Sequence, residues 1–177
     1  MMAASTWNLD KSHSGITFSV RHMMITNVRG SFNQFDAELT ADPADLSSLE
    51  TSLTIDVASI DTKDEGRDGH LKSPDFFNAE QFPQISFKKT SLSSKGGDDY
   101  SLTGDLTVAG VTKSVTLNAE ISGPAKDPWG NTKLGVVGDG VISRSEFGLT
   151  WNAALETGGF LVGDAIKIHV ELEFAQA

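Results

Sequence analysis

Apolar and polar residues alternate with a period of two along much of the chain, which is typical of β-strands with one buried face. The pattern is clearest near the C-terminus, where apolar residues from Ile166 to Phe174 alternate with Lys, His and Glu. The same alternation runs through residues 16–22, 53–57, 85–88, 102–108 and 115–121. We therefore expect a strand in each of these segments.

Turn signals separate several of these segments. Gly-rich or Pro-containing stretches lie at residues 95–99, 109–110 and 127–131, each flanked by apolar runs. Glycine permits the chain reversal and proline fixes φ, so these stretches predict hairpin connections. Short strands with one polar and one apolar face, joined by hairpins, indicate an antiparallel barrel or a sandwich.

The alternation is lost between residues 61 and 84, where short helical signals replace it. Thr62 and Glu65 have the spacing of a capping box. Ser73 followed by Pro74 has the order expected at the start of a second short helix, and Pro83 would end it. We expect one or two short helices here, lying across the barrel wall or one open end.

Composition narrows the function classes. The 177 residues contain no cysteine, so disulfides, a cysteine nucleophile and thiolate metal sites are excluded. A formal charge of −10 argues against nucleic acid and against an anionic membrane surface as main partners. We see no linker and expect a single domain over residues 1–177.

The chain has no run of apolar residues long enough for a spanning helix, so we expect no stable membrane insertion. Residues 1–10 contain no Lys or Arg and no apolar run, unlike a secretory signal. We therefore expect a cytoplasmic protein.

The interior of such a barrel can be filled or can hold a ligand, and both alternatives stay open at this point. Few side chains are placed to support catalysis or metal binding. Three histidines, His13, His22 and His70, could meet in space as a metal site, but capping or core hydrogen bonding explains them as well. Arg144 is a candidate ion-pair member, either tying the structure together or contacting a ligand head group. No phosphate-binding or nucleophile-elbow motif is present, and we expect no cofactor and no metal.

Several motifs together resemble the YceI-like family. The similarity begins at Trp7 and extends to about Phe174. Its most specific part is the block at residues 67–87, which runs from Arg-Asp-Gly-His-Leu-Lys-Ser-Pro-Asp-Phe-Phe to Phe-Pro-Gln-Ile-Ser-Phe. The other matching segments are residues 7–10, 13–14, 18–22, 28–35, 104–113 and 143–149.

The resemblance implies an extended, lipocalin-like antiparallel barrel of eight strands, with a long apolar pore that takes a polyisoprenoid or another long amphiphile. It also implies which residues would line the pore, although some of them must be ordinary core: Phe18, Val20, Phe32, Phe35, Phe76, Phe77, Phe82, Phe87, Leu106, Val108, Phe147 and Trp151. His22 and Arg144, with His70 as a further candidate, would lie at the polar end. Many family members carry a signal peptide, whereas this chain resembles the cytoplasmic branch.

The leading hypothesis is thus non-catalytic binding of a long-chain isoprenoid or similar lipid, for carriage, storage or sequestration. One alternative is an enzyme that acts on a long-chain substrate through a histidine with a carboxylate or a metal. Another is a stress-associated barrel with a filled interior. A homodimer is plausible by analogy with the family.

Overall fold

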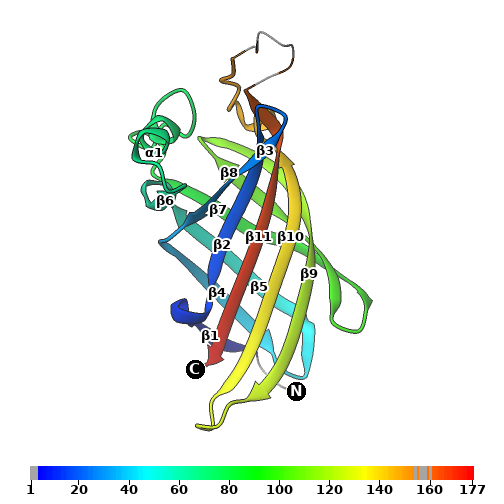
Figure 1. Ribbon diagram of the computed structural model, residues 1–177. Coiled ribbons are helices and arrows are strands. Elements are labelled where there is room, and N and C mark those ends of the chain that lie inside the picture. Colours follow the sequence, from blue (N-terminus) through cyan, green and yellow to red (C-terminus); the bar gives the residue numbers. More distant parts are fainter. Residues whose placement is uncertain (1–3, 154, 156–158, 160) are drawn as a thin grey trace.

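The computed structural model describes residues 4–153, 155, 159 and 161–177 (Figure 1). These residues form mainly strands, with one α-helix, α1 (Glu65–Lys72), and the 3₁₀ helices η1 (Lys11–His13), η2 (Val57–Ser59) and η3 (Arg144–Phe147). The described strands are β1 (Ser5–Leu9), β2 (Gly15–His22), β3 (Thr26–Phe32), β4 (Phe35–Asp42), β5 (Asp45–Asp56), β6 (Ile60–Asp61), β7 (Gln84–Gly96), β8 (Asp99–Val108), β9 (Val111–Lys126), β10 (Thr132–Ser143) and β11 (Val162–Gln176).

Eight of the described strands form a closed antiparallel ring in the order β1-β4-β5-β7-β8-β9-β10-β11, with β11 returning to β1. The expected eight-stranded barrel is therefore confirmed. Where β1 pairs with both β4 and β11, closure leaves no free sheet edge. Figure 1 shows the long strands running steeply between the two ends of the molecule.

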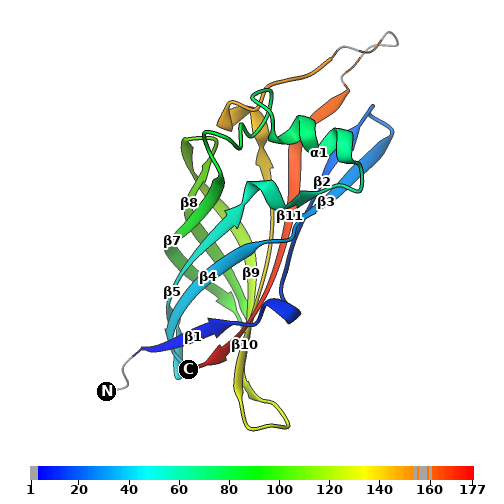
Figure 2. The same cartoon turned by 90° about the vertical axis from the view of Figure 1, so that its left-hand side faces the viewer.

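β1 closes the ring at one end only. Trp7 pairs with Leu39 of β4 on one side and with Gln176 of β11 on the other. Farther along β11, β2 replaces β1 as the neighbour, and β3 and β6 follow β2. We call the end that holds β1 and both termini the base, and the opposite end, which carries α1, the α1 end (Figures 1 and 2).

The predicted strand segments and hairpins are found in the structure. The alternating segments fall in β2, β5, β7, β8, β9 and β11. The turn stretches at residues 95–99, 109–110 and 127–131 connect β7 to β8, β8 to β9 and β9 to β10. Ala109 and Gly110 form the shortest of these connections, and both have positive φ, as a tight two-residue turn requires.

The prediction of one or two short helices in residues 61–84 is confirmed, but the predicted caps are wrong. A single helix is present, and its N-cap is Asp64, whose carboxylate accepts a hydrogen bond from the Arg67 amide at 3.0 Å. Thr62 does not cap it. Its buried hydroxyl instead donates to Asp68 and accepts from Arg67 Nε, so these two side chains bind Thr62 rather than each other. No second helix begins at Ser73, which is the C-cap of α1 and is followed by turns.

Buried apolar residues form two clusters, one at each end of the barrel. The base is packed solid around Trp7 and Phe174, which are 2% and 0% exposed. The Trp7 indole also donates a hydrogen bond to the Ala41 carbonyl at 3.4 Å. The second cluster lies toward the α1 end and includes Phe76 from the segment after α1. Among the described residues, no helix combines the length and apolar composition needed to cross a bilayer.

Candidate functional site

An apolar cavity occupies the barrel between the packed base and the α1 end. Its wall is built from the inward faces of the strands, and α1 and the turns after it supply Leu71, Phe76 and Phe77. The remaining lining residues are Ile16, Thr17, Phe18, Val20, Phe32, Thr51, Leu53, Ile55, Ile60, Ile85, Phe87, Leu102, Leu106, Val108, Val115, Leu117, Val136, Gly138, Ile142, Arg144, Phe147, Leu149, Val162, Ile166, Ile168, Val170 and Leu172.

The cavity is long and narrow. Its volume is about 200 Å³. Its lining follows β11 from Val162 to Leu172, a stretch of roughly 30 Å at about 3.3 Å per residue. An apolar space of this shape suits an extended chain better than a compact molecule.

Two glycines help to keep this space open. A Cβ atom built on Gly30 would collide with the ring of Phe18, and one on Gly104 would collide with the ring of Phe87. Both rings therefore rest against bare backbone on a neighbouring strand. A side chain at either glycine would push the ring away from that backbone.

An aromatic cluster covers part of the α1 end. The His70 ring lies edge-on to Trp151, with centroids 4.6 Å apart, and edge-on to Phe76 at 5.1 Å. Phe76 and Trp151 are 5.5 Å apart. His70 Nε2 is 2.9 Å from Asp75 Oδ2, which fixes the orientation of the imidazole. The cluster joins α1 to the segment after η3, and its member Phe76 lines the cavity.

Arg144 is the one charged residue in the described cavity lining, and it is only 7% exposed. Its guanidinium donates to four backbone carbonyls, those of Leu149 at 2.7 Å, Trp151 at 3.0 Å, and Val162 and Gly163 at 3.2 and 2.8 Å. Burial lowers the pKa of Arg144, with nearby Asp164 opposing the shift. These bonds use four of the five guanidinium N–H groups and hold the segment after η3 against β11.

Most of the residues singled out from the sequence line this cavity, and they come from strands far apart in the chain. They are Phe18, Val20, Phe32, Phe76, Phe77, Phe87, Leu106, Val108, Arg144 and Phe147. Aliphatic residues such as Ile55, Ile166 and Ile168 also line the cavity, although they were not among the predicted site residues. The signal for them was present, because they share the inward faces of the same alternating segments.

The other predicted residues lie outside the described lining. His22 is half-buried at the end of β2, opposite Val162 and Thr26. Phe35 borders a separate, more polar groove on the barrel side. Phe82 packs over Gly110 at the turn between β8 and β9. Trp151 belongs to the aromatic cluster at the α1 end, together with His70.

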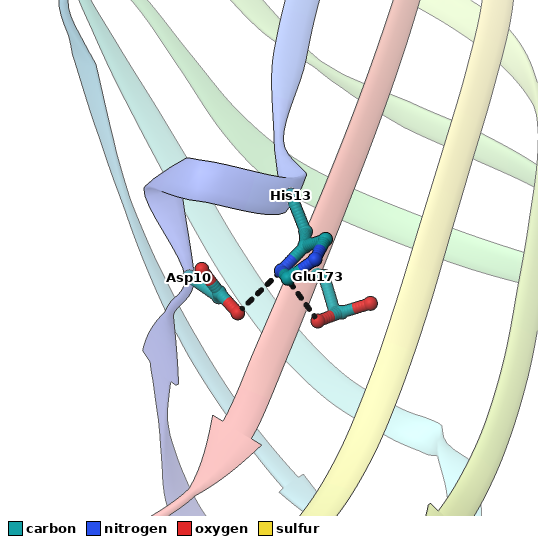
Figure 3. Close-up of side chains that lie close together, drawn as sticks. All are labelled: Asp10, His13 and Glu173. Atoms are coloured by element: carbon teal, nitrogen blue, oxygen red, sulfur yellow. Dashed lines mark hydrogen bonds and ion pairs between the residues drawn. The ribbon is translucent and has the colours of Figure 1, made fainter. Parts of the chain in front are cut away.

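The histidines considered as a metal site do not converge. Among the described residues, the one group with metal-ligand spacing is Asp10, His13 and Glu173, on the outside of the base (Figure 3). His13 Nδ1 lies 2.9 Å from Asp10 and 3.5 Å from Glu173. Lys133 Nζ already contacts the same carboxylates at 3.3 and 3.5 Å. Because its ammonium group shares these oxygens, we treat the group as an ion-pair network.

Comparison with known proteins agrees with this architecture. The YceI-like domain model matches residues 7–174. The chain belongs to the YceI-like family. It is also 38% identical to a UPF0312 protein of Staphylococcus aureus strain USA300 over 172 residues, which cover 97% of this chain and 98% of the relative.

Solved structures share the fold. Burkholderia cenocepacia BcnA superposes with a TM-score of 0.81 at 26% identity, covering 94% of this chain and 99% of BcnA. The Campylobacter jejuni YceI protein gives 0.75 at 34% identity, covering 89% and 90%. A polyisoprenoid-binding domain from Saccharophagus degradans gives 0.72 at 13% identity, covering 98% and 99%.

Replacing Arg144 should loosen the segment that it holds. We expect Arg144→Gln to lower the free energy of unfolding by about 2–4 kcal/mol, because several carbonyls lose a charged donor at once. Arg144→Lys should recover only part of this loss, since an ammonium group cannot reproduce the planar fork. Urea denaturation measures both effects. A loss below about 0.5 kcal/mol in the Gln variant, the range of ordinary surface substitutions, would contradict this role.

The base network should make stability depend on pH. Hydrogen bonds from Ser12 and His13 lower the pKa of Asp10, and the hydrogen bond and charge of Asp10 raise the pKa of His13. The contribution of His13 to folding stability is therefore complete below the unfolded-state pKa of about 6.5. It is lost as the pH rises through the pKa of His13 in the folded protein. The contribution of Asp10 to folding stability is lost as the pH falls below about 4.

We thus expect His13→Gln to lower the melting temperature at about pH 5.5 and to matter progressively less at alkaline pH. Thermal melts of both proteins across this range give the result. In an Asp10→Asn background, the same substitution should show a much weaker pH dependence. A melting-temperature difference that stays constant with pH would refute the network.

Proposed function

We propose that this protein binds a long apolar chain, a polyisoprenoid or a similar amphiphilic lipid, inside the barrel without chemical conversion. The single observation that carries the proposal is the narrow apolar cavity that extends along β11. Burial of each methylene group contributes about 0.8 kcal/mol, so an extended chain gains affinity along its whole length. The Saccharophagus degradans domain, which shares the fold, is described as a polyisoprenoid-binding domain, and this supports the proposal.

The cavity also suggests an orientation for the ligand. The wall toward the base is aliphatic, whereas Arg144 lies at the α1 end. Four of its five guanidinium N–H groups donate to the described carbonyls, which leaves one N–H for a ligand. We infer that the chain points toward the base and that a polar head lies near Arg144. An oxygen atom on that head could accept a hydrogen bond from the fifth guanidinium N–H group.

A binding role also fits the chemistry of the wall. The described lining contains no carboxylate and no imidazole, and Arg144 is its one ionisable group. General acid–base catalysis needs a group that exchanges protons near neutral pH and reaches the reacting atoms. The carriage, storage or sequestration of a water-insoluble lipid needs only the apolar space.

Gly138 offers a direct test of the cavity. It is a buried lining residue on β10, and a Cβ atom there would meet Leu117 at an ordinary 3.6 Å. We expect Gly138→Leu to obstruct the middle of the channel. Affinity for a long polyprenyl alcohol should fall at least tenfold, while farnesol, which needs only the part nearer Arg144, should lose less.

Gly135→Leu is the matched control, because Gly135 is on the same strand, is not in the described lining and has nothing within 4 Å of a built Cβ. Trp151 fluorescence reports binding in a background with Trp7→Phe and Trp129→Phe. Equal affinity of the Gly138 and Gly135 variants for the long alcohol, with both proteins folded, would contradict binding along the channel.

A further inference from the structure

The turn between β2 and β3 presents apolar side chains to solvent. Met23, Met24 and Ile25 are 41%, 58% and 69% exposed. Three consecutive exposed apolar residues at a hairpin tip are unusual, because tips are ordinarily polar. Figures 1 and 2 both show this turn at the α1 end. Leu71 of α1 lines the cavity.

The backbone at the tip is also unusual. Met23 and Met24 have φ values of +53° and +63°, in the left-handed region that bulky residues avoid. A turn with positive φ at both central positions ordinarily contains Asn-Gly, which adopts it with less strain. Local strain of this kind is often kept at functional sites. The Met24 sulfur lies against Gly159, yet Met23 and Met24 stay 41% and 58% exposed, so the strained tip still presents apolar surface to solvent.

Three backbone groups of the tip have partners within the protein. The Met23 amide donates to the Leu161 carbonyl at 2.8 Å, and the Ile25 amide donates to the His22 carbonyl at 3.1 Å. The Met24 carbonyl accepts from Arg21 Nη2 at 3.2 Å. Because these backbone groups have partners, the tip can enter an apolar medium without leaving them unsatisfied.

The hairpin that carries the tip has no acidic side chain of its own, unlike the chain as a whole. Residues 15–35 contain Arg21 and Arg29 and no Asp or Glu, in a chain that has 24 acidic residues and a net charge of −10. Both arginines are exposed. Arg21 lies beside the apolar tip, an arrangement that matches a lipid surface, where phosphate groups lie above the acyl region.

We propose that the β2–β3 turn docks the α1 end onto a phospholipid membrane by inserting Met23, Met24 and Ile25 into the interface. The turn lies in the interface and does not span the bilayer. This inference deepens the proposed function, because a docked barrel would face the source of a lipid ligand with its covered end. The remaining acidic surface would stay on the water side.

Sedimentation with phosphatidylcholine vesicles tests the proposal. The wild-type protein should partition onto the vesicles. Ile25→Ser should reduce the partition coefficient roughly tenfold, because burial of one aliphatic side chain accounts for about that factor. Trp129→Ser is the matched control, since Trp129 is 83% exposed in the loop between β9 and β10 at the opposite end, and its loss should change nothing. Wild-type protein that stays in solution would overturn the proposal, and a protein-docking role for the turn would then take its place.

A second variant separates docking from folding. Met23→Asn/Met24→Gly places the residues favoured by this turn at the strained positions, so we expect a raised melting temperature together with weaker vesicle binding. An unchanged vesicle partition in this variant would overturn the proposal. The opposite signs of the two effects would exclude a loss of binding through unfolding.

Uptake of farnesol from solution, followed by Trp151 fluorescence, distinguishes this proposal from the proposed function. The turn is outside the described cavity lining, so its variants should take up farnesol like the wild type. Vesicle binding without uptake would refute the lipid-binding function and leave docking in place. Uptake without vesicle binding would refute docking alone.

Discussion

The architecture depends on the closure of the sheet by β1, a strand of five residues. Without β1, the lower parts of β4 and β11 would be free edges, each with unpaired amides and carbonyls. β1 also brings Trp7 into the base, where it packs among Leu39, Leu134 and Phe174. One short strand therefore satisfies the backbone of two long strands and fills the narrow end of the barrel.

The cavity follows from uneven filling of one continuous interior. At the base, a buried tryptophan and phenylalanine occupy the space between opposite walls. Toward the α1 end the inward residues are also large, but the ring tips of Phe18 and Phe87 lie against the bare backbone of Gly30 and Gly104. The same sheet thus gives a solid core at the base and an open channel where glycines make room for the aromatic rings.

Much of the fold could be predicted from the sequence, because alternation and turn residues are local signals. Six strands and three connections followed from them. Among the strands that escaped detection, β10 has weak alternation because Gly135, Gly138 and Gly140 carry no side chain. β4 alternates, but two of its buried residues are the small Ala37 and Ala41, which give a weaker apolar signal. The pairing of β1 with both β4 and β11 joins distant segments, and no local pattern specifies it.

In the candidate site, too, some residues could be predicted from the sequence and others could not. Inward-facing aromatic residues such as Phe18 and Phe87 could be chosen from the family resemblance and from the strand pattern. The covering cluster could not, because the contact between His70 and Trp151 joins two segments outside the regular strands. Nor could the partners of Arg144 be foreseen, since the sequence suggested a carboxylate or a ligand head group and the structure supplies backbone carbonyls. A buried guanidinium bound to carbonyls depends on loop conformation, which periodicity does not encode.

The central claim is that the channel holds a long apolar chain. Native mass spectrometry of the freshly purified protein, followed by solvent extraction and mass analysis of the released material, tests it most directly. The account predicts a discrete added mass that extraction identifies as a polyprenyl compound or another long-chain amphiphile. A bare protein mass that remains unchanged after incubation with added polyprenyl lipids would contradict it.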